Sequence, residues 1–447
     1  MSRSLQDLTE AMLAAARKAG ADAADALAVE GTSLAIHLRQ GKLEQAERSE
    51  GVDLGLRVLV GRRQACVSVS DTSDRTITEV AARAVAMAKE APEDPFAGLA
   101  EPDQLARDWD LAALELAEDG AEPGAAALED QARRAEVAAL ATGAITQVEA
   151  AAGYSMRRMH LAMSNGFSGG YARSSHSVSA VAFAGEGTGM ERDWAAEGRT
   201  FRDDLPAPEE IGRLAGERAL ERLGARKPAT GAYPVLYDER VAASLIGHLL
   251  GAVNGSAIAR GASWARDLLG QQVLPKGLSV IEDPHRPRIG ASRPFDAEGL
   301  PTRRRAIVDD GVLTGWTLDL ATARKLGMAS TANASRGTTA PPSPGTGNID
   351  LTQGAASRDE LIAAMGTGLL VTSMIGSSIN ATTGDYSRGA SGFWVENGQI
   401  AYPVNEVTVA GNLRDMLLRI TPANDARAHL STRVPSLLVE GLTLAGA

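Results

Sequence analysis

Histidine is the residue type that first suggests chemistry in this sequence, because an imidazole binds metal ions and exchanges protons near neutral pH. The six histidines are His37, His160, His176, His248, His285 and His429. No two of them have the spacing of metal ligands on a helix, and the sequence contains no HExxH motif. A metal site assembled from distant histidines therefore has no signal in the sequence.

His248 lies in the apolar stretch ASLIGHLLGAV, residues 243–253. The leucines and the isoleucine of this stretch recur with the period of a helix that is buried along one side. Zinc peptidases often place a second histidine and a catalytic glutamate one turn earlier on such a helix. Those earlier positions hold Ala243 and Ser244. From these residues alone, we interpret His248 as a half-buried structural histidine in a core helix.

Ser168 is another candidate, because GFSGG (residues 166–170) matches the G-x-S-x-G pattern of serine hydrolases. That chemistry requires the serine on a tight turn from strand to helix, with a histidine and an acid nearby. Ser168 instead follows the Asn165-Gly166 pair, a strong hairpin signal, and the next segment, which contains His176, resembles a strand. We therefore expect a glycine-rich hairpin, with a stand-alone hydrolase that uses Ser168 as a rival hypothesis.

Charge and composition exclude several classes of protein. The net charge of −11 disfavours direct contact with nucleic acid, which requires a basic surface. No apolar run approaches the ~20 residues of a membrane span, so we expect no membrane segment. The single cysteine, Cys66, allows no disulfide within the chain and indicates a reducing, cytoplasmic environment. No phosphate-binding glycine motif with its lysine occurs.

The elements that must position these residues fall into three expected regions. Residues 1–95 combine an opening helix, an antiparallel meander and a second helix, with Gly31, Gly41, Gly51 and Gly61 expected at its turns. Residues 96–226 begin with an acidic linker and continue with helices and strands. Residues 227–447 carry early helices and then many strands.

The fold class that we predict is α+β. It combines an N-terminal α/β region with antiparallel meanders and a C-terminal β-rich domain with a few packed helices. Within that domain, Asp310-Gly311 and Asn397-Gly398 are expected hairpin turns.

Four long motifs together resemble the TldD/PmbA family. They are GLRVLVGRRQACVSVSD (55–71), RPFDAEGLPTRRRAIVDDGVLTGWTLDLATARKLG (293–327), TANASRG (331–337) and TGDYSRGASGFWVENGQIAYPVNEVTVAGNL (383–413). The similarity spans nearly the whole chain. In the TldD-like branch of that family, a helix carries an HExxxH zinc motif, and a later cysteine is thought to complete the ligand set.

The resemblance implies that this chain has lost the zinc site. Ala243 stands in the slot of the first histidine, Ser244 in that of the glutamate, and Ala390 in that of the cysteine, so only His248 remains. A lone neutral imidazole binds zinc too weakly to hold it. The resemblance therefore places the chain in the PmbA (TldE) branch, with no cofactor in this chain and zinc in a TldD-like partner.

The function implied is that of a subunit of a heteromeric zinc metallopeptidase that degrades or processes unfolded peptides. We expect no catalytic residue in this chain, and His248, Asp385 and Arg388 are candidates to face the partner or the substrate. The expected partners are a TldD-like catalytic subunit and unfolded peptides. A homodimer, formed when that subunit is absent, is a further possibility. The alternatives are a regulatory interaction protein of the gyrase-modulator type and the stand-alone hydrolase.

Overall fold

The structure is a computed structural model that describes residues 3–446. The α-helices are α1 (Leu5–Ala19), α2 (Asp74–Glu90), α3 (Leu111–Leu114), α4 (Ala125–Leu140), α5 (Pro208–Glu221), α6 (Glu239–Ala252), α7 (Gly255–Ala259), α8 (Leu320–Leu326), α9 (Arg358–Met365) and α10 (Leu413–Leu417). The first strands are β1 (Ala23–Arg39), β2 (Lys42–Val60), β3 (Arg63–Val69), β4 (Ile145–Met163), β5 (Ser168–Ala184), β6 (Glu191–Arg199) and β7 (Gly231–Tyr237). The later strands are β8 (Val280–Glu282), β9 (Arg305–Asp309), β10 (Val312–Leu313), β11 (Ala334–Ser335), β12 (Ser343–Pro344), β13 (Ile349–Leu351), β14 (Gly368–Ile379), β15 (Asp385–Glu396), β16 (Gln399–Asn412), β17 (Ile420–Pro422), β18 (Thr432–Arg433) and β19 (Leu437–Ala445).

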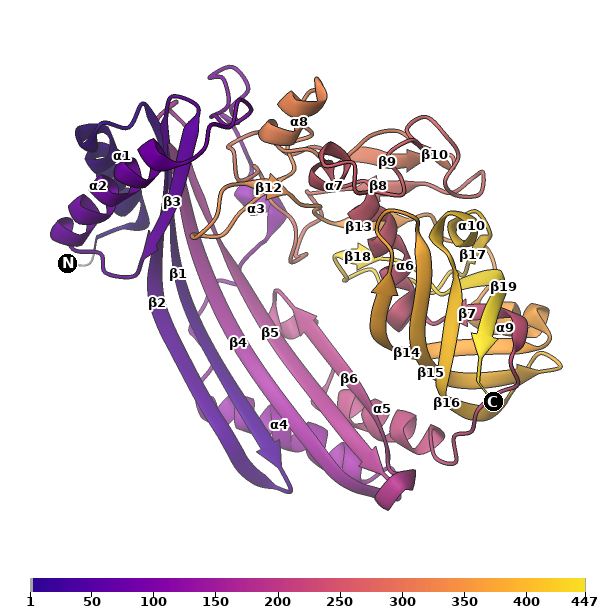
Figure 1. Cartoon of the computed structure of the whole chain (residues 1–447). Helices are drawn as coiled ribbons and strands as arrows, with labels where there is room; N and C mark the ends of the chain where they lie inside the picture. Colours follow the sequence, from indigo (N-terminus) through magenta and orange to yellow (C-terminus); the bar gives the residue numbers. More distant parts are fainter. Residues whose placement is uncertain (1–2, 447) are drawn as a thin grey trace.

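The N-terminal half is built on one long antiparallel sheet with the order β3-β2-β1-β4-β5-β6. Its strands are long and curved, as Figure 1 shows. Alternate residues of β1 point to one face, where Ala24, Ala26 and Ala28 belong to the core formed with α1 and α2. Farther along the same face, Leu34 and Ile36 belong to the core formed with α4 and α5. All four helices therefore cover a single face of this sheet.

The expected turns at Gly31 and Gly51 are wrong, whereas those at Gly41 and Gly61 lie between strands. Gly31 lies inside β1 and Gly51 inside β2, and the two are directly opposite in the register. Glycines within strands mark places where a sheet bends or weakens. The short strands that the turn signals suggested here are therefore joined into one hairpin of two long strands, β1 and β2.

The C-terminal half contains a second six-stranded sheet, with the order β16-β15-β14-β7-β19-β17. An additional pairing between β16 and β19 closes this sheet on itself. Helix α6 packs into the core of this half, where Leu245, Ile246 and Leu249 are fully buried. Two smaller sheets, β10-β9-β8-β13-β18 and β11-β12, complete it. The predicted α+β class, with a β-rich C-terminal domain, is confirmed.

The two halves are joined by a buried ionic cluster. Arg57 on β2 donates from Nε to Asp25 on β1 at 2.6 Å, and Arg336 from the C-terminal half binds the other oxygen of the same carboxylate. Burial lowers the pKa of Arg336 to about 10.

Strands from residues 1–95 and from 96–226 share the long sheet. The division into 1–95, 96–226 and 227–447 stays a prediction. Within residues 3–446, no helix is long and apolar enough to cross a membrane.

Candidate functional site

Helix α6 positions the residues that the resemblance singled out. Its first turn is capped by Asp238, whose carboxylate accepts a hydrogen bond from the backbone N–H of Arg240. One side of the helix is buried, as its apolar period predicts, while Gly247 is exposed. Ala243 packs from α6 against the main C-terminal core.

Strand β15 contacts α6 through Tyr386 and carries the other expected residue, Ala390. Ala390 is 5% exposed and belongs to the core against which Ala243 packs. Tyr386, on the same strand, places its ring centroid 5.8 Å from that of His248, at an interplanar angle of 71°. The structure therefore brings together the helix and the strand on which the resemblance places the zinc slots.

His248 is a neutral imidazole in this environment. Burial lowers its pKa, and the nearby positive charge of Arg388 lowers that pKa further. Its Nε2 atom is buried and has no hydrogen-bond partner among the described residues. The surroundings of His248 are thus aromatic and cationic, and they disfavour a second positive charge.

The residues at these slots do not fit a zinc ion. The hydroxyl of Ser244 donates to the carbonyl oxygen of Val241 at 2.7 Å, and the side chains of Ala243 and Ala390 have no donor atom. Zinc sites require three or four nitrogen, sulfur or oxygen ligands from the protein. Among residues 3–446, no group of three His, Cys, Asp or Glu side chains could hold a metal ion.

Asp385 and Arg388 lie on β15 but differ in setting. Asp385 is exposed, and its carboxylate accepts hydrogen bonds from the Thr383 hydroxyl at 2.7 Å and the Asn412 amide at 3.1 Å. The bond from Thr383, followed by that from Asn412, lowers the pKa of Asp385. Arg388 donates from Nε to the carbonyl oxygen of Gly376 at 2.8 Å. Asp385 therefore stays ionised at a solvent-facing position. Arg388 is hydrogen-bonded to β14 and lowers the pKa of His248.

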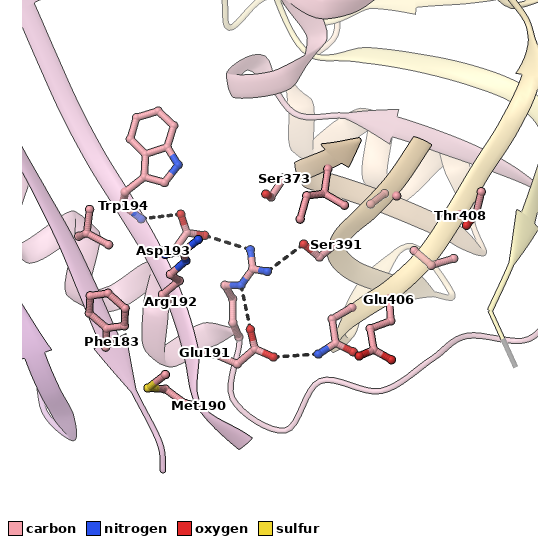
Figure 2. A pocket seen from close by; sticks show the side chains of 17 residues that line it. Phe183, Met190, Glu191, Arg192, Asp193, Trp194, Ser373, Ser391, Glu406 and Thr408 are labelled. Atoms are coloured by element: carbon pink, nitrogen blue, oxygen red, sulfur yellow. Dashed lines mark hydrogen bonds and ion pairs between the residues drawn. The ribbon is translucent and has the colours of Figure 1, made fainter. Parts of the chain in front are cut away.

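A pocket of about 800 Å³ lies between the two large sheets, and we call it the junction pocket. It is lined by Val181, Phe183, residues 190–194 and Arg222 from the N-terminal half, and by Ser373, Ile375 and residues 389–391 and 405–408 from the C-terminal half. Ala390, in the slot of the cysteine, is part of its wall. Figure 2 shows Asp193 and Trp194 on one side and Ser373 and Ser391 on the other.

The polar wall of the junction pocket is held by Arg222 at the end of α5. Its guanidinium donates to Ser391 Oγ at 2.8 Å and lies 3.5 Å from carboxylate oxygens of both Glu191 and Asp193. Glu191 also accepts a hydrogen bond from the Asn405 amide at 2.9 Å. Figure 2 draws these contacts as dashed lines, and those with Ser391 on β15 and Asn405 on β16 connect the two halves. One arginine thus ties the edge of the long sheet to the closed sheet.

The apolar wall is unusually exposed. Ile375 is 78% exposed, Met190 53% and Trp194 49%. Strand β7 pairs with β14 only through Leu369–Val371, so the next residues of β14 have no strand on that side in the described pairings. Sequence reasoning missed this pocket, because its walls come from segments about two hundred residues apart and no local motif marks them.

Ser168 is not arranged as a hydrolase nucleophile. It begins β5 rather than a helix, and its Oγ lies 3.4 Å from Nε2 of His160, a neighbour that the sequence did not suggest. The Nδ1 atom of His160 lies 2.9 Å from the Thr9 hydroxyl, where a triad would place an acid. His176 lies farther along the same strand and pairs with Glu118 at 2.7 Å.

The remaining histidines each have a setting of their own. His37 lies in β1, His285 Nε2 is 3.1 Å from the Thr302 hydroxyl, and His429 Nε2 is 3.1 Å from Glu197.

Comparison with known proteins now identifies the family. Family models for the PmbA/TldA metallopeptidase match domain 1 at residues 24–88, the central domain at 118–223 and the C-terminal domain at 230–446. The chain is 37% identical to the Metalloprotease PmbA of Escherichia coli O157:H7 over 95% of its own length and 92% of that protein. The chain belongs to the PmbA/TldD family. A TldD homologue from Haemophilus influenzae is 26% identical over only 47% of the chain and 44% of that protein, so the chain falls in the PmbA branch.

Solved structures of this family have the same fold. A protein from Bacteroides thetaiotaomicron, described as a candidate modulator of DNA gyrase, superimposes with a TM-score of 0.92 at 27% identity and covers 99% of this chain and 98% of that one. TldE from Thermococcus kodakarensis superimposes with a TM-score of 0.86 at 18% identity, over 98% of this chain and all of that one. The fold of the PmbA branch thus extends over the whole chain.

Proposed function

We propose that this chain is the non-catalytic subunit of a heteromeric metallopeptidase whose zinc is supplied by a TldD-like chain. The observation that carries the proposal is the donor set between α6 and β15, in which Ala243, Ser244 and Ala390 provide neither metal ligands nor a base. A zinc peptidase needs both, because the metal polarises the carbonyl and a base takes the proton of the attacking water. Membership of the PmbA branch supports this assignment.

The subunit would enclose the reaction space and help to hold an extended peptide. The side of β14 that continues beyond Val371 offers backbone groups, and Ile375 offers an apolar contact beside the junction pocket. A peptide that adds a strand to such an edge is recognised mainly through its backbone. Recognition through the backbone depends little on the sequence of the peptide. The substrates would therefore be unfolded peptides, and folded proteins would be excluded.

The decisive experiment compares cleavage of an unstructured peptide by this chain alone, by a TldD-like chain from the same organism, and by their mixture. We expect no cleavage by this chain alone, and chelator-sensitive cleavage by the mixture that exceeds that of the partner. Metal analysis of the purified chain should find far less than one zinc per molecule. Robust cleavage by the pure chain would refute the proposal.

The peptide-holding role can be tested separately. In the mixture, Ile375→Glu should raise KM for the peptide and leave the zinc content unchanged, because it places a charge beside the junction pocket. Leu418→Glu is the matched control, since Leu418 is also an exposed apolar residue (42% exposed) and does not line the junction pocket. Equal effects of the two variants would rule out a specific role of the pocket.

A further inference from the structure

Helix α5 borders two hollows that are separate from the junction pocket. The smaller has a volume of about 220 Å³ and is lined in part by residues 194–197 of β6. The larger has a volume of about 490 Å³ and is lined in part by residues 400–403 of β16. Leu214, Arg218 and Arg240 contribute to both, so the two hollows adjoin, and we call them together the α5 groove. The larger hollow alone has the size of a site for a small ligand.

Arg218 brings a charge without a counter-ion into the α5 groove. It is half-buried, and one of its Nη atoms donates to the carbonyl oxygen of Trp194 at 3.1 Å. It forms no ion pair with a carboxylate among the described residues. Burial, followed by the charge of Arg240, lowers the pKa of Arg218, although three nearby carboxylates act in the opposite direction. An anion that bound to this guanidinium would therefore supply the partner that the chain does not.

The other arginines of the groove are already paired. Each has a carboxylate oxygen within 3.1 Å: Arg213, Arg240, Arg358 and Arg427. Glu210 and Glu221 also line the groove and have no ion pair among the described residues, but both are exposed. Water and salt screen exposed charges, so these two glutamates oppose an anion at Arg218 only weakly.

The larger hollow offers an apolar surface beside Arg218. Ile400 is 51% exposed there, and the rings of Phe393 and Tyr402 are half-buried. The hydroxyl of Thr372, which also lines this hollow, is buried and has no hydrogen-bond partner among the described residues. Buried polar groups rarely lack a partner. The hollow thus suits a ligand with an apolar body and a polar group that reaches Thr372.

We propose that the α5 groove binds the C-terminal residue of a peptide, with its carboxylate on Arg218 and an apolar side chain in the larger hollow. A planar guanidinium holds a carboxylate through two parallel hydrogen bonds. Trp194, which Figure 2 shows beside the junction pocket, also lines the smaller hollow, so the α5 groove adjoins the place where a peptide would be held. The inference rests on the proposed function for the class of ligand, and it adds that the peptide is read at its end.

Calorimetric titration of the purified chain tests this binding without any cleavage. The ligands are acetylated alanyl-leucine as the free acid, the same dipeptide as its C-terminal amide, acetylated alanyl-glycine as the free acid, and free leucine. We expect the leucine-ended acid to bind at least about tenfold more tightly than the amide, because the amide loses the charged partner of Arg218. It should also bind more tightly than the glycine-ended acid, which leaves the larger hollow unfilled. Equal binding of acid and amide, or free leucine bound as tightly as the dipeptide, would overturn the proposal.

Variants assign the two parts of the ligand to their residues. Arg218→Gln should abolish the preference for the acid over the amide, and Arg218→Lys should keep part of it. Ile400→Gln, at an exposed position, should keep that preference and reduce the preference for leucine over glycine. Arg83→Gln is the control, because Arg83 is an exposed helical arginine outside the groove, and it should bind like the wild type. Unfolding in urea checks that each variant is folded. An unchanged preference in Arg218→Gln, or its loss in Arg83→Gln, would contradict the assignment.

Failure of this inference is distinguishable from failure of the proposed function. Equal binding of acid and amide, together with cleavage by the mixture and none by this chain alone, would remove only the C-terminal site. Cleavage by the pure chain would refute the non-catalytic role, and the titration would still decide whether Arg218 holds a carboxylate.

Discussion

The imidazole of His248 shows how a single buried group responds to its neighbours. Burial and then Arg388 hold its pKa below the ordinary value of 6.5, so the folded protein binds this proton more weakly than the unfolded chain does. The free energy of unfolding should therefore fall as the pH drops below about 6.5. Arg388→Met should raise the pKa of His248 towards 6.5, which proton NMR of the ring can follow, with His248→Gln to assign the signal. An unchanged pKa would contradict the role of Arg388.

Glu298 predicts the opposite dependence on pH. It is 3% exposed, and burial, followed by the charges of Asp296 and Asp319, raises its pKa to about 8. The folded protein binds this proton more strongly than the unfolded chain, so the contribution of Glu298 to stability falls as the pH rises from about 4.5 to about 8.

Glu298→Gln should remove that dependence. The new amide oxygen can still accept the hydrogen bond from the backbone N–H of Leu320, which Glu298 accepts at 2.8 Å. We expect the variant to gain stability over the wild type at pH 9 and little at pH 5, as measured by chemical denaturation. Glu90→Gln, at an exposed position, is the control and should show no such trend.

At the scale of elements, the packing of α4 against α5 depends on a glycine. A Cβ atom on Gly212 of α5 would lie 1.9 Å from the carbonyl oxygen of Ala135 on α4, so the two backbones must be in close contact. Gly212→Ala should force the helices apart and destabilise the protein by about 1–3 kcal/mol. Gly247→Ala in α6 is the matched control, since a Cβ there meets nothing within 4 Å, and it should stabilise by about 0.5–1 kcal/mol. Urea denaturation distinguishes the two.

Elements specified by local chemistry could be predicted from the sequence. Asp310 and Gly311 both have positive φ values, 47° and 84°, as do Asn397 and Gly398, at 52° and 74°. These are the conformations that tight hairpins require, and such residue pairs adopt them readily. The long strands could not be predicted in the same way, because Gly31 and Gly51 give a local turn signal that the pairing of β1 with β2 overrides.

At the scale of the whole molecule, the candidate site depends on contacts that no local pattern contains. The neighbourhood of α6 and β15 was expected only because the motifs resembled a family with a known arrangement. The junction pocket was not expected at all, since Trp194 and Ile375 meet across it only after both sheets have formed. The residue types at positions 243, 244 and 390 could indicate which metal ligands and which base are missing beside His248. Only the fold shows which residues surround it.

Arg240 is the residue whose loss should separate the two halves of the molecule. It lies on α6, its side chain is 8% exposed, and it contacts Asp193 on β6 and Asp238 at 3.1 Å each. Arg240→Ala removes one counter-charge from each of two buried carboxylates, while Arg222 stays beside Asp193 and Arg358 beside Asp238. The cost should therefore lie below the ~3–5 kcal/mol of a fully unpaired buried charge. Arg213→Ala is the control, because the Arg213–Glu217 pair is exposed and contributes about 0.3–0.5 kcal/mol.

The two variants should differ in more than overall stability. Because Arg240 connects the edge of the long sheet to the C-terminal half, its removal should favour partial opening between β6 and β15. Limited proteolysis should then cleave the connection between α5 and β7 faster in Arg240→Ala than in the wild type, while Arg213→Ala behaves like the wild type. Equal cleavage rates in all three proteins would mean that the halves are held together chiefly by the cluster of Asp25, Arg57 and Arg336.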